Sequence, residues 1–216
     1  LPKSRLYRTT PAEKEAIEKQ INDMMELGIL EESISSTASP VILVHKPDNT
    51  YRFCIDLRGI NRCIYPDAFP VPLLNDLYDS LGQAATDNSL YSLLDLKSAF
   101  WQLPLKEESK PLTSFCTFMG TYQMNCLPFG LATSPAAFQR VINKVLRGYL
   151  YKFVLAYIDD LVIYSPDMET HLKHIELVLQ RLQGANLTIK PQKCFWMRRK
   201  ILYLGHLING GTARPN

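Results

Sequence analysis

Two adjacent carboxylates, Asp159 and Asp160, lie between the apolar runs 153–157 and 161–164. Both runs are rich in aromatic and β-branched residues, which is typical of β-strands. The segment 153–164 therefore predicts a tight hairpin with the two acids at its tip. Like charges side by side repel each other, and a divalent metal ion is a simple partner that relieves this repulsion. A plain surface turn is the alternative, because Asp is common in turns.

A third carboxylate, Asp95, stands at the end of the apolar run 90–94. If that strand lies beside the hairpin, three carboxylates converge at one edge of a sheet. Such a cluster is stabilised by two divalent cations roughly 4 Å apart, an arrangement that serves in-line phosphoryl transfer. Because the ligands are all oxygen atoms, we expect two Mg²⁺ or Mn²⁺ ions and not zinc.

Other residues are weaker candidates for phosphate, metal or nucleic-acid binding. Lys46 and Arg52 would lie near each other on a projecting hairpin, either as solvated cations or as a clamp for phosphate. His171 and His174 are three residues apart on a helix, but nothing is spaced to complete a metal site, so we expect surface histidines. The basic run 190–200 is interleaved with aromatic residues, which favours contact with a nucleic-acid backbone.

The elements that must position these residues follow from local patterns. Helices are expected from Pro11 to Gly28, at 73–81, from Ser134 to Gly148, and at 168–183, the last with Leu172, Ile175, Leu179 and Leu182 on its apolar face. Strands are expected at 41–44, 51–55, 90–94, 112–118, 121–126, 187–189 and 201–203, and 66–72 is a proline-rich connector. This order predicts an antiparallel sheet backed by helices, an α+β fold.

The composition restricts the class of protein but does not indicate a function. The chain has 216 residues, of which 46% are hydrophobic and 21% charged, and these values are ordinary for a globular protein. A net charge of +3 neither requires nor excludes a nucleic-acid partner. No apolar run is long enough to span a membrane, so no membrane partner is expected. The five cysteines form no C-x-x-C pair, which favours reduced thiols in an intracellular protein.

At this point the motifs together resemble a known family. The tetrapeptide 157–160 (YIDD) resembles the Y-x-D-D signature of reverse transcriptases. Four more stretches resemble motifs of that family and occur in the family's order: 52–61 (RFCIDLRGIN), 94–100 (LDLKSAF), 127–138 (LPFGLATSPAAF) and 203–206 (YLGH). Phe129 and Ile158 are more similar to Gypsy-type LTR retrotransposons than to retroviruses. The loop 84–89 is longer than the family usually has.

The resemblance implies the fingers and palm of a right-hand polymerase, with the thumb absent and the chain cut from a longer protein. Residues 1–89 and 106–128 would be mostly fingers, and 90–105 and 129–216 mostly palm, ending at the primer grip. Such a piece alone is expected to be poorly active.

The resemblance also implies a role for each matching residue. Asp95, Asp159 and Asp160 would be catalytic and would bind the metals, helped by the Leu96 backbone carbonyl. Phe100, five residues after Asp95, would be the steric gate that rejects ribonucleotides. The residues expected to bind dNTP are Lys46, Arg52, Ser98, Ala99, Phe100, Phe129, Gly130 and Lys190, with Lys190 preferred over Lys193 near the pyrophosphate. The residues expected to contact template or primer are Asp56, Arg58, Tyr157, Tyr203, Leu204, Gly205 and His206.

The expected function is RNA-directed DNA polymerase activity in a cytoplasmic virus-like particle. Its partners would be an RNA or DNA template with primer, dNTPs, and the rest of a Pol polyprotein with thumb, connection, RNase H, integrase and protease. A non-catalytic, domesticated or truncated nucleic-acid-binding palm domain is the alternative. An RNA-directed RNA polymerase is disfavoured, because a ring at position 100 would exclude ribonucleotides.

Overall fold

The computed structural model describes residues 6–46, 50–84, 86, 88–209 and 212–215. The chain forms two compact units, each assembled from two separate stretches of sequence. Unit 1 comprises Leu1–Asp67 and Phe100–Ser134, and unit 2 comprises Ala68–Ala99 and Pro135–Asn216. The fingers and palm boundaries expected from the sequence stay a prediction. The expected turn at 45–50 and loop at 84–89 lie partly outside the described residues.

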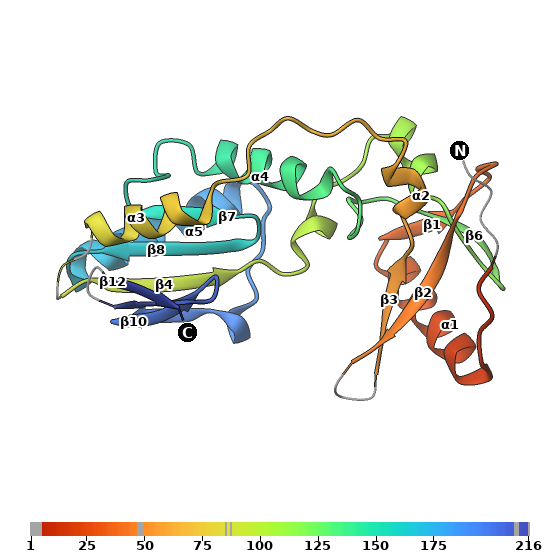
Figure 1. The fold of residues 1–216 in the computed structure, drawn as a ribbon, viewed down its shortest axis with the longest axis horizontal. Helices are drawn as coiled ribbons and strands as arrows, with labels where there is room; N and C mark the ends of the chain where they lie inside the picture. The colour runs from red at the N-terminus through yellow and green to blue at the C-terminus, as the bar shows by residue number, and fades with distance from the viewer. Residues whose placement is uncertain (1–5, 47–49, 85, 87, 210–211, 216) are drawn as a thin grey trace. The chain divides into compact units, whose positions relative to one another are not determined.

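Unit 1 is built on a five-stranded sheet with the strand order β1-β6-β5-β2-β3 (Figure 1). Neighbouring strands are antiparallel except for the parallel pair β2 and β5. The strands are β1 (Leu30–Glu32), β2 (Ser39–His45), β3 (Tyr51–Ile55), β5 (Phe115–Thr117) and β6 (Gly120–Met124). The helical elements are α1 (Pro11–Glu26), α2 (Arg58–Asn61), η2 (Glu107–Thr113) and, at the boundary with unit 2, η1 (Ala99–Gln102).

Helix α1 forms where the sequence predicts it. Thr10 Oγ1 accepts the Glu13 N–H at 3.3 Å, and the Glu13 carboxylate accepts the Thr10 N–H at 2.7 Å, which completes a capping box. Ile17 and Ile21 are buried and belong to one apolar cluster with Phe115 of β5. The apolar stripe of α1 therefore fixes the helix on the sheet.

Unit 2 contains a four-stranded sheet with the order β7-β8-β4-β9 and a three-stranded sheet with the order β10-β11-β12. All the paired strands of both sheets are antiparallel. The strands are β4 (Leu90–Asp95), β7 (Val154–Tyr157), β8 (Asp160–Ser165), β9 (Phe195–Arg198), β10 (Lys200–Tyr203), β11 (His206–Asn209) and β12 (Thr212–Pro215). The helices are α3 (Leu74–Ala84), α4 (Ser134–Val145), α5 (Met168–Gly184) and η3 (Pro191–Lys193).

One apolar cluster holds unit 2 together. It includes Leu77 of α3, Tyr91 of β4, Val162 of β8, and Ile201 and Ile208 of the three-stranded sheet. Helix α3 therefore joins the two sheets, and this cluster supports the strand that ends at Asp95. The α+β class with antiparallel sheets backed by helices is confirmed.

Helix α5 differs from the expectation in which face it buries. His171, Val178 and Leu182 are buried, whereas Leu172 is exposed. The prediction of two surface histidines is therefore wrong for His171, and His174 is half-buried. An i, i+7, i+11 spacing places His171 in line with the buried valine and leucine, so the helix turns the imidazole inward.

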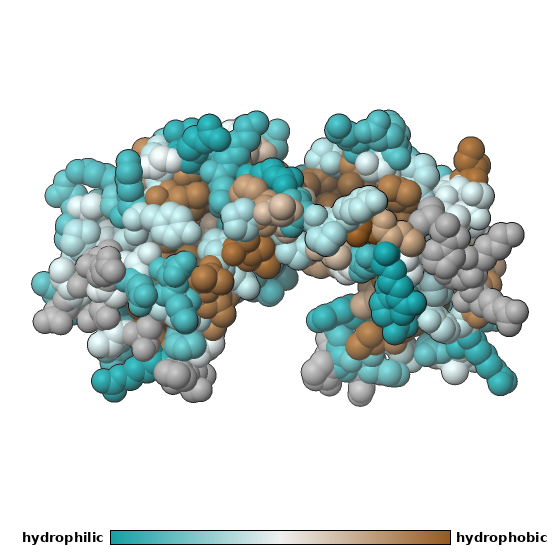
Figure 2. All heavy atoms as spheres, turned by 45° about the horizontal axis from the view of Figure 1, so that its top comes forward, coloured by the Kyte–Doolittle hydropathy of each residue, from teal (hydrophilic) through white to brown (hydrophobic). Residues whose placement is uncertain are grey.

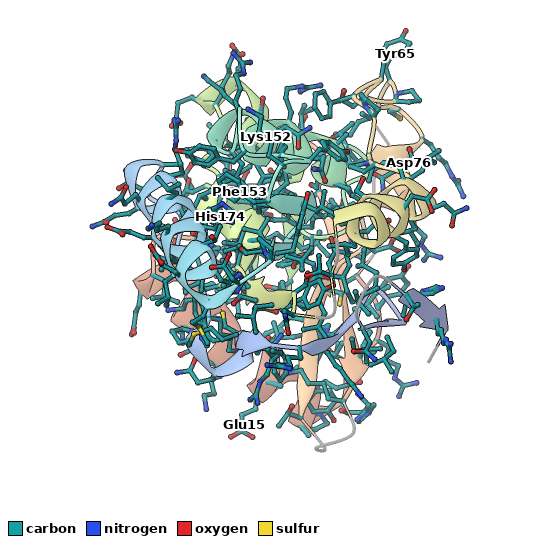
Figure 3. The ribbon with its side chains drawn as sticks, turned by 90° about the vertical axis from the view of Figure 1, so that its left-hand side faces the viewer. Glu15, Tyr65, Asp76, Lys152, Phe153 and His174 are labelled. Carbon is teal, nitrogen blue, oxygen red and sulfur yellow. The ribbon has the colours of Figure 1, made fainter. Side chains whose placement is uncertain are left out.

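A chain of hydrogen bonds accommodates these histidines inside unit 2. His171 Nε2 lies 2.8 Å from Ser92 Oγ and His171 Nδ1 lies 2.8 Å from Ser165 Oγ, which also lies 2.7 Å from His174 Nδ1. Burial lowers the pKa of His171 to about 4, so its imidazole is neutral near pH 7. The His174 ring stacks on Phe153 with 3.9 Å between ring centroids (Figure 3). These histidines tie α5 to the four-stranded sheet.

Two expected strands are shorter or absent. Residues 112 and 113 belong to η2 and not to the strand expected at 112–118, and the Thr113 hydroxyl donates to the Lys110 carbonyl oxygen of η2 at 2.7 Å. The strand expected at 187–189 is reduced to one bridge between Ile189 and Leu96. Strands β1, β9, β11 and β12 were not expected.

Among the described residues, no helix is both long enough and apolar enough to cross a membrane. All five cysteines are free. Hydrophilic side chains cover much of the face drawn in Figure 2, with smaller apolar groups between them.

Candidate active site

The acid hairpin, formed by β7 and β8, carries Asp159 and Asp160. Tyr157 and Asp160 are paired at its closed end, so the two-residue turn consists of Ile158 and Asp159 and not of the two acids. Ile158 has a φ of 58°, in the left-handed region that glycine usually occupies in such turns. A residue with a Cβ atom there costs roughly 1–2 kcal/mol of backbone strain. The surrounding structure must therefore hold this turn in place.

Helix α4 supplies that support through Gln139, which is fully buried. Gln139 Oε1 accepts the Ile158 N–H at 2.7 Å, and Gln139 Nε2 donates to the Ala156 carbonyl oxygen at 3.1 Å. Strand β7 is at the edge of its sheet, and Ala156 adjoins the closing pair, so its carbonyl points away from β8. Gln139 therefore satisfies backbone groups that β8 cannot reach and fixes the turn that carries Asp159.

Strand β4 brings Asp95 beside the acid hairpin, as the sequence led us to expect. Asp95 and Asp160 are direct partners in the antiparallel pair of β4 and β8, so their side chains lie on the same face of the sheet. Burial first, and then the charges of Asp159 and Asp95, raise the pKa of Asp160 to about 6. Burial is also the main cause that raises the pKa of Asp159, and the charge of Asp95 adds to it.

A lysine that we did not favour from the sequence lies at this cluster. Lys193 Nζ is 3.3 Å from Asp95 Oδ2, and its charge opposes the rise in the pKa of Asp159 and Asp160. Lys190 instead uses its backbone N–H, which donates to the Asp95 carbonyl oxygen at 2.7 Å. The preference for the Lys190 side chain over that of Lys193 therefore finds no support in these contacts.

The donor chemistry of the cluster fits a divalent cation. Three carboxylates supply only oxygen ligands, which suit Mg²⁺ and Mn²⁺. As the side chains stand, the described residues contain no group of three or more His, Cys, Asp or Glu placed to hold a metal ion. Because Asp95 is paired with Lys193, a cation bound by Asp95 competes with that ammonium for the carboxylate.

In unit 1, residues expected to line the nucleotide pocket lie together. The rings of Phe100 and Phe129 are 5.0 Å apart between centroids, and Phe129 is half exposed. Gly130 has a φ of 87°, a conformation that favours glycine. Asn61 fixes this bend, since its Nδ2 donates to the Gly130 carbonyl oxygen at 2.8 Å and its Oδ1 accepts the Ala132 N–H at 2.8 Å.

The two expected phosphate-binding cations share one hairpin of unit 1. Arg52 of β3 is the direct partner of Val44 of β2, and Lys46 is two residues beyond Val44. Side chains alternate along a strand, and direct cross-strand partners share a face. Lys46 and Arg52 therefore project from the same face of the β2–β3 hairpin.

Asp56 and Arg58, expected to contact template or primer, are bonded to each other. Arg58 Nε and Nη2 donate to the two Asp56 carboxylate oxygens at 2.8 and 2.7 Å, and the Tyr7 hydroxyl donates to Asp56 Oδ2 at 3.1 Å. These bonds, led by those from Arg58, hold the pKa of Asp56 far below its usual range. The Arg58 guanidinium remains exposed and presents the positive side of the pair to solvent.

The hairpin β10–β11 contains the four residues expected at the primer grip. Tyr203 and His206 are direct partners, and Leu204 and Gly205 form the turn between them. Tyr203 is 1% exposed, so its side chain belongs to the core, and its expected contact with template or primer stays a prediction. The turn residues and His206 remain accessible to solvent.

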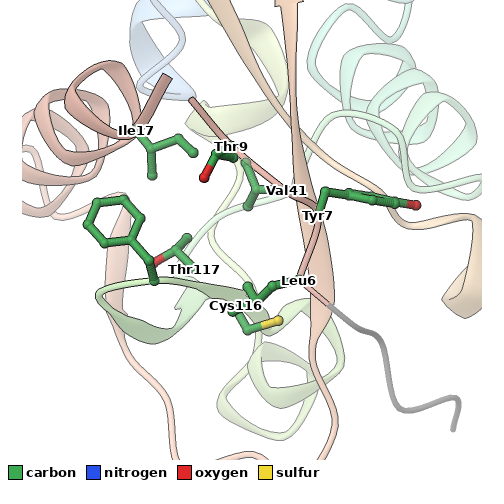
Figure 4. A pocket seen from close by; sticks show the side chains of 8 residues that line it. Leu6, Tyr7, Thr9, Ile17, Val41, Cys116 and Thr117 are labelled. Atoms are coloured by element: carbon green, nitrogen blue, oxygen red, sulfur yellow. The ribbon is translucent and has the colours of Figure 1, made fainter. Parts of the chain in front are cut away.

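A separate hollow in unit 1 is too small for a nucleotide. Its volume is about 30 Å³, room for about one water molecule. Figure 4 shows the side chains that line it, among them Tyr7, Ile17 and Cys116.

Three residues of the site received no role from the sequence. Gln139 lies three and seven residues before the buried Ile142 and Leu146, so a polar residue within the buried stripe of α4 was the available signal. Lys193 had no feature to separate it from the other cations of its basic run. Asn61 was part of a motif, but its bonds connect segments distant in sequence, which no local pattern reveals.

Known proteins are similar to this chain in sequence and in fold. A family model described as "Reverse transcriptase (RNA-dependent DNA polymerase)" matches residues 44–208. The chain is 35% identical over 218 residues to the Retrovirus-related Pol polyprotein from transposon 297 of Drosophila melanogaster, covering 99% of this chain and 20% of that protein. It is 32% identical over 211 residues to the Transposon Tf2-3 polyprotein of Schizosaccharomyces pombe, covering 98% and 16%. The chain thus spans a fifth or less of these relatives, which are consistent with the Gypsy-type resemblance.

The fold of this chain is similar to that of solved protein structures. The native protease-reverse transcriptase of prototype foamy virus has a TM-score of 0.83 and 27% identity, covering 96% of this chain and 28% of that one. The foamy viral protease-reverse transcriptase in complex with RNA/DNA hybrid has a TM-score of 0.86 and 24% identity, covering 99% and 28%. The similarity is consistent with the expected palm and fingers fold.

Proposed function

Because this chain belongs to the reverse transcriptase (RNA-dependent DNA polymerase) family, we propose that it catalyses RNA-directed DNA synthesis within a retrotransposon Pol polyprotein. It would add dNTPs to a primer 3′ end on an RNA or DNA template. The observation that carries this proposal is the register of β4 and β8, which sets Asp95 directly opposite Asp160 with Asp159 next to it in the turn.

The three carboxylates would bind two Mg²⁺ or Mn²⁺ ions, since reverse transcriptases generally use divalent metal ions. When bound, such ions activate the attacking hydroxyl and neutralise charge on the leaving phosphates. Asp95 and Asp159 would be the main ligands, the Leu96 carbonyl a further one, and Asp160 would complete the acidic cluster. The raised pKa values of Asp159 and Asp160 support this assignment, because a cation stabilises the ionised forms that burial disfavours.

The dNTP would be held by side chains of the motifs described above. Lys46 and Arg52 project from one face of their hairpin and would bind the triphosphate, the arginine as a bidentate fork. Phe129 and Gly130 would form a wall of the pocket, and Phe100, packed on Phe129, would exclude the 2′-hydroxyl of a ribonucleotide. The proposed dNTP contacts also include Ser98, Ala99 and Lys190.

Each unit, taken by itself, carries residues proposed to contact template or primer. Arg58, oriented by Asp56, offers an exposed cation to a phosphate backbone. Tyr157 and the turn residues Leu204, Gly205 and His206 would contact the primer. Similar foamy viral proteins were solved with an RNA/DNA hybrid and with ds DNA, which supports a paired nucleic acid as the partner. The rest of the Pol polyprotein would accompany this chain in a virus-like particle.

Extension of a primed RNA template in the presence of Mg²⁺ tests the proposal. The wild-type Pol polyprotein that contains this chain should incorporate dNTPs, since this piece alone is expected to be poorly active. In that protein Asp159→Asn should abolish incorporation and weaken Mn²⁺ binding measured by calorimetry. Asp79→Asn is the matched control, because Asp79 is an exposed carboxylate on α3 of the same unit. Extension by Asp159→Asn at the wild-type rate would refute the catalytic assignment. A wild-type Pol polyprotein that binds the hybrid but never extends it would favour the non-catalytic alternative.

A further inference from the structure

Tyr78 of α3 contacts the turn of the β10–β11 hairpin, although more than a hundred residues separate them. The Tyr78 hydroxyl donates to the Leu204 carbonyl oxygen at 2.8 Å. Its ring also packs against the His206 ring, with 4.2 Å between centroids and 37° between planes. One side chain therefore contacts both ends of the short segment 204–206.

The turn needs outside support because of the residue that occupies it. Leu204 and Gly205 have φ angles of 48° and 84°, which is the pattern of a type I′ turn. That turn favours Asn, Asp or Gly at its first position, and leucine is strained there. The bond from Tyr78 and the packing of Leu204 on the apolar cluster of unit 2 offset this strain.

Helix α3 is a rigid base for that bond. Leu77 and Leu81, on either side of Tyr78 in sequence, are 0% and 1% exposed and pack in the same cluster as Ile201 and Ile208 of the hairpin strands. Tyr78 itself is 8% exposed, so its hydroxyl has few alternatives in water. The position of the Leu204 carbonyl is therefore tied to α3 and not only to its own strands.

We propose that Tyr78 is a positioning residue for primer binding, which it serves by fixing the Leu204–Gly205 turn. This inference rests on the proposed primer contact of residues 204–206. Tyr78 touches no substrate in this role. It sets the conformation in which the turn and His206 meet the nucleic acid.

Tyr78→Phe tests the proposal because it removes the hydroxyl and keeps the ring on His206. Loss of one hydrogen bond should speed amide hydrogen exchange at Tyr203 and His206, the closing pair of the turn, by about 3- to 10-fold. The Kd for an RNA/DNA hybrid, measured by fluorescence anisotropy, should rise by a similar factor, since the binding-competent turn is less populated. The KM for dNTP should stay unchanged.

Two further variants separate positioning from a general loss of stability. Tyr164→Phe removes a hydroxyl from the same apolar cluster but from a strand of the other sheet, and it should leave exchange at Tyr203 and His206 unchanged. Leu204→Asn gives the turn an Asn-Gly pair that favours positive φ by itself. In that background Tyr78→Phe should have a smaller effect on the Kd.

The outcomes distinguish this inference from the proposed function. Unchanged exchange in Tyr78→Phe overturns the inference, whatever the activity. Faster exchange with an unchanged Kd also overturns it, while metal-dependent extension by the same protein would leave the proposed polymerase function standing. A wild-type Pol polyprotein that binds hybrid and fails to extend it counts against the polymerase function alone, and one that binds no hybrid overturns both.

Discussion

Replacing Gln139 with leucine removes the side chain of α4 that hydrogen-bonds the backbone of the acid hairpin. Gln139 is fully buried, accepts the Ile158 N–H at 2.7 Å and donates to the Ala156 carbonyl oxygen at 3.1 Å. Leucine fills a similar volume and can make neither bond. The substitution therefore leaves one N–H and one carbonyl oxygen at the hairpin without their partner.

The size of the effect follows from those two groups. An unsatisfied buried donor or acceptor costs roughly 1–3 kcal/mol. We expect the free energy of unfolding to fall by about 2–4 kcal/mol, the lower part of the summed range, because a turn can partly open to water. A turn that opens also releases the strain at Ile158 and moves Asp159. Since a displacement of about 1 Å can cost about 10²-fold in rate, we expect kcat for primer extension to fall about 100-fold.

Urea unfolding and primer extension at saturating dNTP measure these two effects. Gln180→Leu makes the same exchange at an exposed position of α5 and should change the free energy of unfolding by less than about 0.5 kcal/mol. If Gln139→Leu unfolded at the same urea concentration as Gln180→Leu and kept its full kcat, the two bonds from Gln139 would not be what holds the hairpin in place.

Phe100 and Asp160 give three further predictions. Phe100→Val should raise incorporation of ribonucleotides relative to dNTPs in primer extension, because the ring packed on Phe129 is proposed to exclude the 2′-hydroxyl; an unchanged sugar preference would reject the gate. The pKa of Asp160, raised from 3.8 to about 6 by burial and neighbouring charges, predicts that Mn²⁺ binding measured by calorimetry weakens as pH falls below about 6. Between pH 3.8 and about pH 6, the Asp160 carboxyl binds more protons in the folded metal-free chain than in the unfolded chain. Asp160 should therefore make the free energy of unfolding of the chain decrease as pH rises through this range. Urea unfolding of the wild-type chain and of Asp160→Asn at several pH values measures the part of this pH dependence that is due to Asp160. If Asp160 instead made the free energy of unfolding increase with pH, the raised pKa would be contradicted.

Local patterns predicted the elements of this chain better than their tertiary pairing. The strand that ends at Asp95 and the capped helix α1 were predictable, because apolar runs, Thr10 and Glu13 act on their immediate neighbours. Asp95 faces Asp160 because of the register between β4 and β8, which are distant in sequence. The sequence suggested that these strands are neighbours, but no local pattern fixes their register.

The features that the sequence did not predict also depend on contacts between residues distant in sequence. His171 is polar, and its burial is tolerated because Ser92 and Ser165 hydrogen-bond both of its ring nitrogens. The positive φ of Ile158 contradicts the preference of isoleucine, and Gln139 from another element imposes it. The roles assigned to the individual site residues stay predictions.

The division of the sequence between the two units has a consequence for synthesis on the ribosome. Strand β4 emerges well before its partners β8 and β9, while the chain between them completes unit 1. During that interval its apolar residues and both its hydrogen-bonding edges have no sheet to join, a condition that promotes aggregation in nascent chains. The strand that delivers Asp95 therefore depends on sequence made much later for both of its partners.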